Sequence, residues 1–346
     1  MKAGRRPDDQ PGRWSRQAGS RHACVRSGRR RFQMSSTPGH EPIDRRQFGR
    51  HADMVSIVGV GGYHLGNVKT VGEAVRIVHE AIDAGVNFLD NAWEYHQGES
   101  ERRMGRAIEG RRDSVFLMTK VCTHGRDAKV AMRQLDQSLR RLRTDHLDLW
   151  QIHECVYGND PERHFAKGGV VEALERAKAQ GKVRYVGFTG HKDPEIHQRM
   201  LSFDFPFDAC QLPLNGFDAN FRSFQTRVLP ELARRKIAAI GMKSLGGDGR
   251  VVEKRAARVG DALRYAMSLS VCTTISGIDS LKVLRQNLKI ARGFSPMNAR
   301  ERSAYERSLA AAALDGRFEL YKTSAEHEGD VGRKQHGFPS QDEVAR

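Results

Sequence analysis

The chain has 346 residues and a formal net charge of +16, with 58 Lys and Arg against 42 Asp and Glu. Its length suits one large domain with extensions or two small domains. No apolar run approaches the ~18 residues that a membrane-spanning helix needs, so we expect no membrane partner.

The first 33 residues carry much of the charge. They contain one Lys and nine Arg against Asp8 and Asp9, which gives +8 of the +16. This segment is poor in aliphatic residues and cannot bury enough surface to fold alone. We therefore predict that residues 1–43 form a disordered, Arg-rich arm and that the protein has no nucleic-acid partner. Met34 offers an alternative start, in which case residues 1–33 would not be translated.

The stretch "DRRQFGR" at 44–50 is similar to a twin-arginine export signal. The residues behind it are polar and then form a glycine-broken strand, whereas export requires an apolar segment of about 7–15 residues. The five cysteines are widely spaced and contain no CxxC pair, so they predict neither a disulfide framework nor a metal site. We expect a cytoplasmic protein.

From residue 55 onward, short apolar or β-branched runs alternate with stretches of helical spacing. The predicted strands lie at 55–60, 87–92, 115–121, 147–155, 183–190, 208–215, 237–244 and 271–278. The predicted helices lie at 71–85, 100–110, 128–144, 169–182, 194–201, 221–236, 260–270 and 280–294. Strands that alternate with helices predict a parallel sheet.

Eight β–α units in this length predict a single-domain (β/α)8 TIM barrel over residues 44–294. An open doubly wound sheet would need a GxGxxG fingerprint after the first strand, and "GVGGYHLG" has His64 where the third glycine belongs. Residues 295–346 begin with a helix and continue as a tail. The tail would either fold over the barrel mouth or, for residues 325–346, be a disordered end.

Four polar residues end or follow three successive predicted strands: Asp90, Tyr95, Lys120 and His153. Active sites of such barrels lie at the carboxyl ends of the strands, so we expect the four to meet there. Hydride transfer to a carbonyl leaves an alkoxide that needs a proton. Tyr95 is the candidate general acid and base, and the Lys120 ammonium would lower its pKa. Asp90 would hold Lys120, and His153 would orient the carbonyl oxygen.

We predict no metal in this site. A metal-dependent barrel hydrolase would need an HxH pair at the first strand, where the sequence has only His64. The other candidates follow separate strands: His96, His124, His153 and His191. The hydride must then come from an organic cofactor. Two glycine-rich loops, "KSLGGDG" and "SGIDS", follow the last two strands, where these barrels commonly bind phosphate.

The motifs together resemble those of the aldo/keto reductases. D-x-A-x-x-Y with G-x-S-E is followed in order by a strand ending in T-K, "DLWQIH", "GKVRYVGFTG", "QLPLN" and "SGIDSLKVLRQN". The resemblance covers roughly residues 44–294 and points to a bacterial branch with altered "GFTGH" and "GMKSLGG" signatures. It implies the barrel fold, the four catalytic roles and reversible NAD(P)H-dependent reduction of aldehydes or ketones.

The resemblance also implies a cofactor site. Thr189, Gly190 and Gln211 would meet the nicotinamide amide, and Met242 would replace a ring-stacking tyrosine. The predicted pyrophosphate residues are Lys243, Ser244, Leu245 and Gly246. Gln286 and Asn287 would lie at the adenine. Gly61 and Gly277 are the remaining predicted cofactor-binding residues.

NADP(H) is the habitual cofactor of the family, but Asp279 would repel a 2′-phosphate and makes NAD(H) plausible. Lys282 and Arg285 on the next helix could offset this acid. We expect Tyr63, Trp93 and His124 to line the mouth for a small carbonyl substrate. A cofactor-binding, redox-sensing barrel and a hydrolase or isomerase on the same fold are the alternatives. The identity of the carbonyl compound and the oligomeric state stay open.

Overall fold

The computed structural model describes residues 42–122, 126–325, 327–335 and 337–344. All of them lie in the second of the chain's two units, residues 37–346. The predicted arm over residues 1–43 therefore lies outside the described residues, apart from Pro42 and Ile43. Ile43 is buried in the main core, so the folded region includes it.

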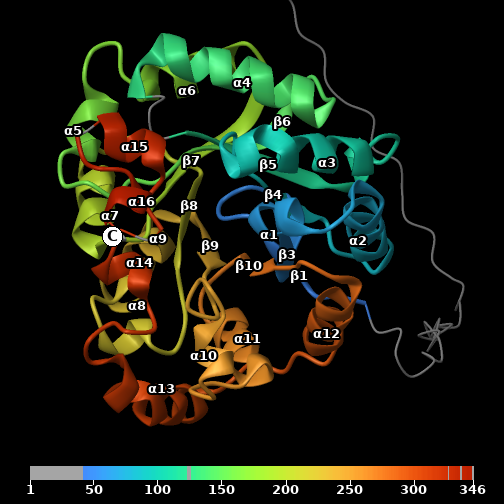
Figure 1. Ribbon diagram of the computed structural model, residues 1–346, viewed down its shortest axis with the longest axis vertical. Coiled ribbons are helices and arrows are strands. Elements are labelled where there is room, and N and C mark those ends of the chain that lie inside the picture. Colours follow the sequence, from blue (N-terminus) through green and yellow to red (C-terminus); the bar gives the residue numbers. More distant parts are fainter. Residues whose placement is uncertain (1–41, 123–125, 326, 336, 345–346) are drawn as a thin grey trace, which may run out of the picture. The chain divides into compact units, whose positions relative to one another are not determined.

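Eight parallel strands close into a barrel in the order β10-β3-β4-β5-β6-β7-β8-β9 (Figure 1). The predicted (β/α)8 barrel is confirmed. The barrel strands are β3 (Val58–Gly61), β4 (Phe88–Asp90), β5 (Phe116–Val121), β6 (Leu147–Ile152), β7 (Val183–Thr189), β8 (Ala209–Pro213), β9 (Ala238–Met242) and β10 (Thr273–Gly277).

Helices surround the barrel and bury their apolar faces against it (Figure 1). In α2, Ala74, Ile77, Val78 and Ala81 recur at helical spacing and are buried, and Thr70 caps the first turn. The helices after the first six barrel strands are α1 (Gly62–Asn67), α2 (Val71–Asp83), α3 (Glu99–Ala107), α4 (Ala128–Leu142), α5 (Asp160–Phe165), α6 (Val170–Ala179), α7 (Pro194–Ser202), α8 (Phe224–Arg227) and α9 (Leu229–Arg235). Short 3-10 turns are η1 (Tyr95–Gly98), η2 (Arg112–Ser114) and η4 (Asp218–Asn220).

The remaining helices are α10 (Arg250–Glu253), α11 (Val259–Ser268), α12 (Leu281–Arg292), α13 (Ala299–Ala313), α14 (Leu320–Thr323), α15 (Asp330–Gln335) and α16 (Gln341–Val344). No helix within the described part of the chain is both long and apolar enough to span a membrane. The predicted helix at 221–236 is divided between α8 and α9, because Pro230 lies in the first turn of α9 and lacks the N–H needed to continue α8.

The predicted first strand at 55–60 is also divided. Its first part belongs to β2 (Met54–Ser56), which pairs antiparallel with β1 (Arg45–Gln47). The Ser56 N–H donates to Asn87 Oδ1 at 2.7 Å, which turns the chain out of the hairpin before β3 begins. Phe48 follows the hairpin strand β1 and packs at 4.7 Å on the ring of Phe116. The twin-arginine stretch therefore closes the amino end of the barrel, opposite the carboxyl ends of the strands.

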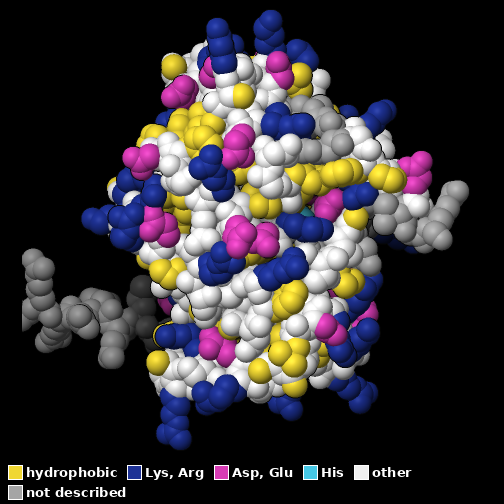
Figure 2. All heavy atoms as spheres, turned by 90° about the vertical axis from the view of Figure 1, so that its left-hand side faces the viewer, with side chains coloured by type: hydrophobic (Ala, Val, Ile, Leu, Met, Phe, Trp, Pro, Cys, Tyr) yellow, Lys and Arg dark blue, Asp and Glu magenta, His cyan; other side chains and the backbone are white. Residues whose placement is uncertain are grey.

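The C-terminal segment packs beside the barrel, with α14 and α15 drawn near α7 and α8 (Figure 1). Lys192, in the loop between β7 and α7, fastens it: Lys192 Nζ donates at 2.5 Å to Oε1 of Glu328, which lies between α14 and α15. Figure 2 shows the face on this side of the molecule, where basic and acidic side chains are interspersed. On this face the basic side chains of the described residues therefore do not form one continuous basic patch of the kind that binds nucleic acid.

Candidate active site

The structure brings Asp90, Tyr95, Lys120 and His153 together at the carboxyl end of the barrel. Asp90 ends β4, Lys120 lies in β5, His153 follows β6 and Tyr95 begins η1. Lys120 Nζ lies 2.6 Å from Asp90 Oδ1 and 3.4 Å from Tyr95 Oη. It also donates to the carbonyl of Asn91 at 2.8 Å. The ammonium is therefore held between the carboxylate and the phenol.

Two glutamines fix the Asp90 carboxylate from the other side. Gln211 Nε2 donates to Asp90 Oδ2 at 2.6 Å, and Gln151 Nε2 donates to Gln211 Oε1 at 3.0 Å. All three residues are buried, so these bonds are shielded from water. The sequence predicts Gln211 at the nicotinamide amide. The residue lines the cavity, but its own amide is engaged by Asp90 and Gln151.

The pKa of Tyr95 differs from the expectation. Burial raises it well above the ordinary value of a phenol, and the negative charges of Asp90 and Glu94 raise it further. The net lowering expected from Lys120 is wrong, because burial and these negative charges outweigh it. Tyr95 is consequently a protonated phenol across the neutral range, a state in which it can donate but does not ionise spontaneously.

His153 is a neutral imidazole in this environment, since burial lowers its pKa to about 3. Its Nδ1 lies 2.5 Å from Glu94 Oε1. Together with Glu154, these residues offer ligand atoms within 4.8 Å of one another, a group that could surround a cation. Ligands bonded at ~2.05 Å in a tetrahedral site stand ~3.3 Å apart. The 2.5 Å between Glu94 Oε1 and His153 Nδ1 is shorter than this separation, and the two atoms do not form a hydrogen bond of acceptable geometry with each other.

A cavity of about 920 Å³ opens in front of these residues. Most of the predicted cofactor and substrate residues line it: Gly61, Tyr63, Thr189, Gln211, Met242, Lys243, Ser244, Leu245, Gly277, Asp279, Gln286 and Asn287. The cavity therefore reaches from Tyr95 past the loops after β9 and β10 to the first turns of α12.

Three predicted residues lie elsewhere. Trp93 points to α4, where its Nε1 donates to Gln137 at 2.7 Å and Arg141 covers its ring, and it is not among the described residues that line the cavity. A side chain at Gly190 would lie 2.2 Å from the carbonyl of Cys155, and one at Gly246 would lie 2.5 Å from that of Phe318. Both glycines permit close backbone packing and do not line the cavity. His124 is outside the described residues.

Asp279, the acid predicted to lie near the adenosine ribose, is exposed and lines the cavity. Asp279 accepts from Ser280 Oγ at 3.1 Å, in the cap of α12. Arg285 cannot offset its charge as expected, because the guanidinium donates to both Glu80 oxygens at 2.7 and 2.9 Å. Lys282 is absent from the described residues that line the cavity.

Several lining residues were not predicted. Glu94 precedes Tyr95 and Glu154 follows His153 in the sequence, and His191 Nε2 lies 3.9 Å from Glu154 Oε1. The C-terminal segment adds residues 327–331. The N–H of Gly329 donates to Glu154 Oε2 at 2.9 Å. The tail thus forms one wall of the site.

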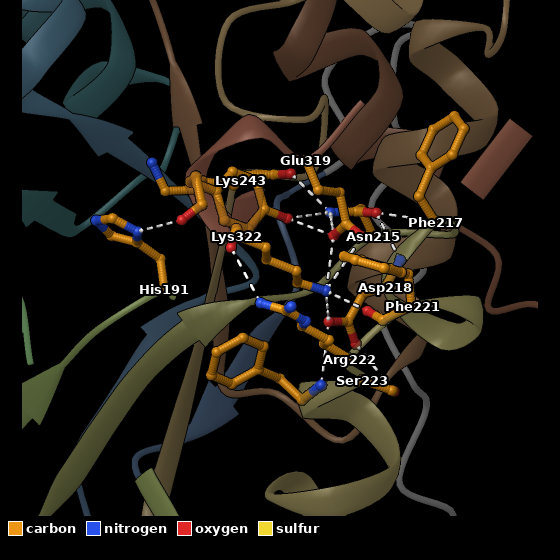
Figure 3. A network of polar contacts seen from close by, with 12 residues as sticks. His191, Asn215, Phe217, Asp218, Phe221, Arg222, Ser223, Lys243, Glu319 and Lys322 are labelled. Carbon is orange, nitrogen blue, oxygen red and sulfur yellow. Dashed lines mark hydrogen bonds and ion pairs between the residues drawn. The ribbon is translucent and has the colours of Figure 1, made fainter. Parts of the chain in front are cut away.

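A buried polar network anchors this tail (Figure 3). Lys322 Nζ donates to Asp218 Oδ1 at 2.7 Å and to Glu319 Oε2 at 3.1 Å, and all three side chains are buried. Tyr321 Oη accepts from Asn215 Nδ2 at 3.0 Å. Burial of a lysine with two carboxylates is costly unless every group is bonded, so this network holds the tail in one place.

The network reaches the cavity through Tyr321. Lys243 Nζ lies 5.1 Å from the centre of the Tyr321 ring. The imidazole of His191 lies 3.4 Å, Nδ1 to oxygen, from the Tyr321 carbonyl (Figure 3). Burial lowers the pKa of Lys243 to about 8, an effect that Glu154 and Asp248 oppose. The tail therefore sets the surroundings of a cavity lysine.

The fold and the site place the chain among (β/α)8 barrels whose polar strand ends share one cavity. The model of the aldo/keto reductase family matches residues 57–262. The chain belongs to the aldo/keto reductase family.

Curated relatives match over part of their length. The chain is 34% identical over 155 residues to an uncharacterized oxidoreductase, YqkF, of Bacillus subtilis, covering 42% of this chain and 48% of that protein. It is 34% identical over 131 residues to the methylglyoxal reductase YeaE of Escherichia coli, covering 38% and 44%. A 6-dehydroglucose reductase of Novosphingobium aromaticivorans is 31% identical over 166 residues, covering 44% and 53%. The chain thus spans about half the length of these relatives.

Solved structures share the fold over most of their length. The holo form of an aldo-keto reductase from Bacillus halodurans has a TM-score of 0.66 at 23% identity, covering 80% of this chain and 99% of that one. An aldo-keto reductase from Klebsiella pneumoniae in complex with NADPH has a TM-score of 0.64 at 24% identity, covering 78% and 95%. At these identities the likeness concerns the fold.

Proposed function

We propose that this protein catalyses the reversible, NAD(P)H-dependent reduction of aldehydes or ketones to alcohols. The observation that carries the proposal is the position of Lys120 Nζ between Asp90 and Tyr95 at the cavity wall. A barrel that only bound a cofactor would have no need of a buried ammonium directed at a phenol, because burying this charge is costly.

The residues present suit a nicotinamide cofactor. The cavity is lined by the loop after β9, in which Lys243, Gly247 and Gly249 have positive φ values of 56°, 95° and 81°, and by the loop after β10. Such backbone can turn its N–H groups toward phosphate, and the Lys243 ammonium adds charge. Met242 offers a polarizable apolar surface to a ring. When bound, the cofactor would supply the hydride.

The chain's own groups would then manage the proton. As charge develops on the substrate oxygen, Tyr95 Oη donates its proton to that oxygen. Lys120 stabilises the phenolate that remains, at a distance of 3.4 Å from Tyr95 Oη. Asp90 keeps the ammonium in place before and after the transfer. His153 faces the same cavity and orients the substrate by a hydrogen bond.

The names of the relatives agree with this chemistry in general terms. Methylglyoxal and 6-dehydroglucose are carbonyl compounds, and an L-galactose dehydrogenase of Arabidopsis thaliana is 31% identical over 158 residues, covering 43% of this chain and 49% of that protein. The Klebsiella enzyme was crystallised in complex with NADPH. These relatives support carbonyl–alcohol interconversion with a nicotinamide cofactor for this chain.

Replacing Tyr95 tests the proposal. In Tyr95→Phe we expect kcat for carbonyl reduction to fall by at least ~100-fold, the low end of a general-acid contribution, with cofactor affinity nearly unchanged. Tyr185→Phe is the control, since this phenol lies at the opposite end of the barrel beside Asp53. If Tyr95→Phe keeps more than a hundredth of wild-type turnover, Tyr95 is not the proton donor.

A further inference from the structure

Two basic side chains from distant parts of the chain lie against the ring of Tyr321. Lys243 begins the loop after β9, and its Nζ lies 5.1 Å from the centre of the ring. His327 belongs to the C-terminal segment, and its imidazole lies edge-on to the same ring with centres 6.1 Å apart. Both residues line the cavity. The C-terminal segment therefore brings a basic group to the loop whose backbone and lysine suit a phosphate.

His327 lies close to the backbone of that loop. A Cβ at Gly247 would lie 3.4 Å from His327 Cε1 and 3.6 Å from Tyr321 Cδ1. His327 Nε2 is buried and has no hydrogen-bond partner among the residues that the structure describes. A buried polar atom of this kind costs free energy until it is paired. The nitrogen is thus available to a ligand in the cavity.

The acids around the two basic groups are engaged by other residues. Those that line this part of the cavity are Glu154, Asp248, Glu328 and Asp330. Asp248 pairs with Arg250 at 2.9 Å, and Glu328 pairs with Lys192 at 2.5 Å. Glu154 accepts from a backbone N–H of the C-terminal segment at 2.9 Å. Within the described part of the chain, neither basic group forms an ion pair with a carboxylate.

The protonation of His327 reflects these surroundings. Burial lowers its pKa to about 3, and the nearby basic groups of Lys243, His191, Arg250 and Lys192 act in the same direction. A bound anion would oppose these charges and favour the protonated imidazole. Occupation of the site should therefore be accompanied by uptake of a proton.

We infer that Lys243 and His327 bind one phosphate group between the loop after β9 and the C-terminal segment. The oxyanion would supply the negative charge that the two groups lack, and each would donate a charge-assisted hydrogen bond to it. The inference rests on the proposed function and deepens it, because it makes the C-terminal segment part of a phosphate site. The phosphate would belong either to the cofactor or to a phosphorylated carbonyl substrate.

The charge of His327 can be followed without any turnover. The full-length protein is labelled with carbon-13 at histidine Cε1, and the His327 signal is assigned by its loss in His327→Gln. Without a ligand, we expect no titration of His327 between about pH 6 and 8. With NADPH, inorganic pyrophosphate or glyceraldehyde 3-phosphate, the signal should titrate within this range. His146, which precedes β6 at the other end of the barrel, is the internal control. If none of the three ligands changes the His327 titration, the inference is overturned.

Affinity measures the contact directly. In His327→Ala we expect the Kd for NADPH, measured by fluorescence titration without substrate, to rise about tenfold, which corresponds to the loss of one hydrogen bond to a charged group. His327→Gln keeps a donor but cannot carry the charge, so the rise should be smaller. His146→Ala is the matched control, and unchanged melting temperatures would show that the variants fold.

A second assay distinguishes the two sources of the phosphate. At saturating NADPH, the kcat/KM of glyceraldehyde 3-phosphate is compared with that of glyceraldehyde. A loss in His327→Ala confined to NADPH affinity assigns the phosphate to the cofactor, and a loss confined to the phosphorylated aldehyde assigns it to the substrate. A loss with either probe supports the inference, whereas no loss with both, or an equal loss in His146→Ala, overturns it. Absence of turnover with every carbonyl compound refutes the proposed function, while the pyrophosphate titration of His327 still tests the inference.

Discussion

Removing the charge of Asp279 should move cofactor preference toward NADPH. Asp279 follows β10, lines the cavity and lies directly before the N-cap residue of α12, where the resemblance places the adenosine ribose. Arg285 is engaged by Glu80, so it does not neutralise this acid. A 2′-phosphate on the ribose would meet an uncompensated carboxylate, whereas a ribose hydroxyl could donate to it.

The exposure of Asp279 limits the effect. Unit charges ~4 Å apart interact by ~1 kcal/mol in water and ~4 kcal/mol at a protein surface. Because Asp279 is exposed, the lower value applies, which corresponds to about fivefold in a ratio of rate constants. We expect Asp279→Ser to raise the NADPH/NADH ratio of kcat/KM by about fivefold at low salt, and by less at about 0.5 M salt because of screening.

Initial rates with both cofactors on wild type, Asp279→Ser and Asp261→Ser measure this ratio. Asp261 is an exposed acid of α11 and serves as the matched control. A change confined to Asp279→Ser supports a ribose contact. An unchanged ratio, or the same change in both variants, would mean that Asp279 does not face the ribose.

Two further predictions concern Lys243 and Lys322. Because burial lowers the pKa of Lys243 to about 8, its ammonium is present below that pH and is lost above it. NADPH affinity, measured by fluorescence titration, should therefore fall as pH rises through about 8. Lys243→Arg should remove this pH dependence. A wild-type affinity that does not change with pH would contradict a contact between Lys243 and a phosphate of the cofactor. Lys322→Met leaves Asp218 and Glu319 buried without their cation and should cost ~3–5 kcal/mol of unfolding free energy by urea denaturation. The exposed Lys289→Met is the control, and equal losses would refute the role of the network.

The barrel and the core of the site were predictable because both depend on local pattern. Each strand is a short apolar run, and Asp90 and Lys120 stand where two of these runs end. Topology then brings successive strand ends together without further information. The pKa of Tyr95 could not be predicted in the same way. It depends on burial and on the nearby charges of Asp90 and Glu94, which spacing in the sequence does not give.

Cavity residues in irregular backbone segments could not be predicted for a different reason. Glu154 has a φ of 52°, and the turn after Glu94 contains two more positive φ values. Neither segment has a glycine at these positions to signal the conformation. Trp93 and Glu94 are adjacent, yet one points to α4 and the other to His153. Only the path of the chain distinguishes them.

The C-terminal segment shows how the site depends on residues far away in sequence. The buried Lys322 ammonium donates to Asp218, to Glu319 and to the carbonyl of Phe221, so the segment is held in one position. That position brings the N–H of Gly329 to Glu154, next to His153 in sequence. A Cβ at Gly329 would lie 3.0 Å from Glu154 and 3.1 Å from Glu94, so a side chain there would require both carboxylates to shift by a few tenths of an ångström. The tail anchor and the surroundings of the two carboxylates are therefore parts of one arrangement, and loss of the anchor should disturb the substrate end of the cavity before it disturbs the barrel.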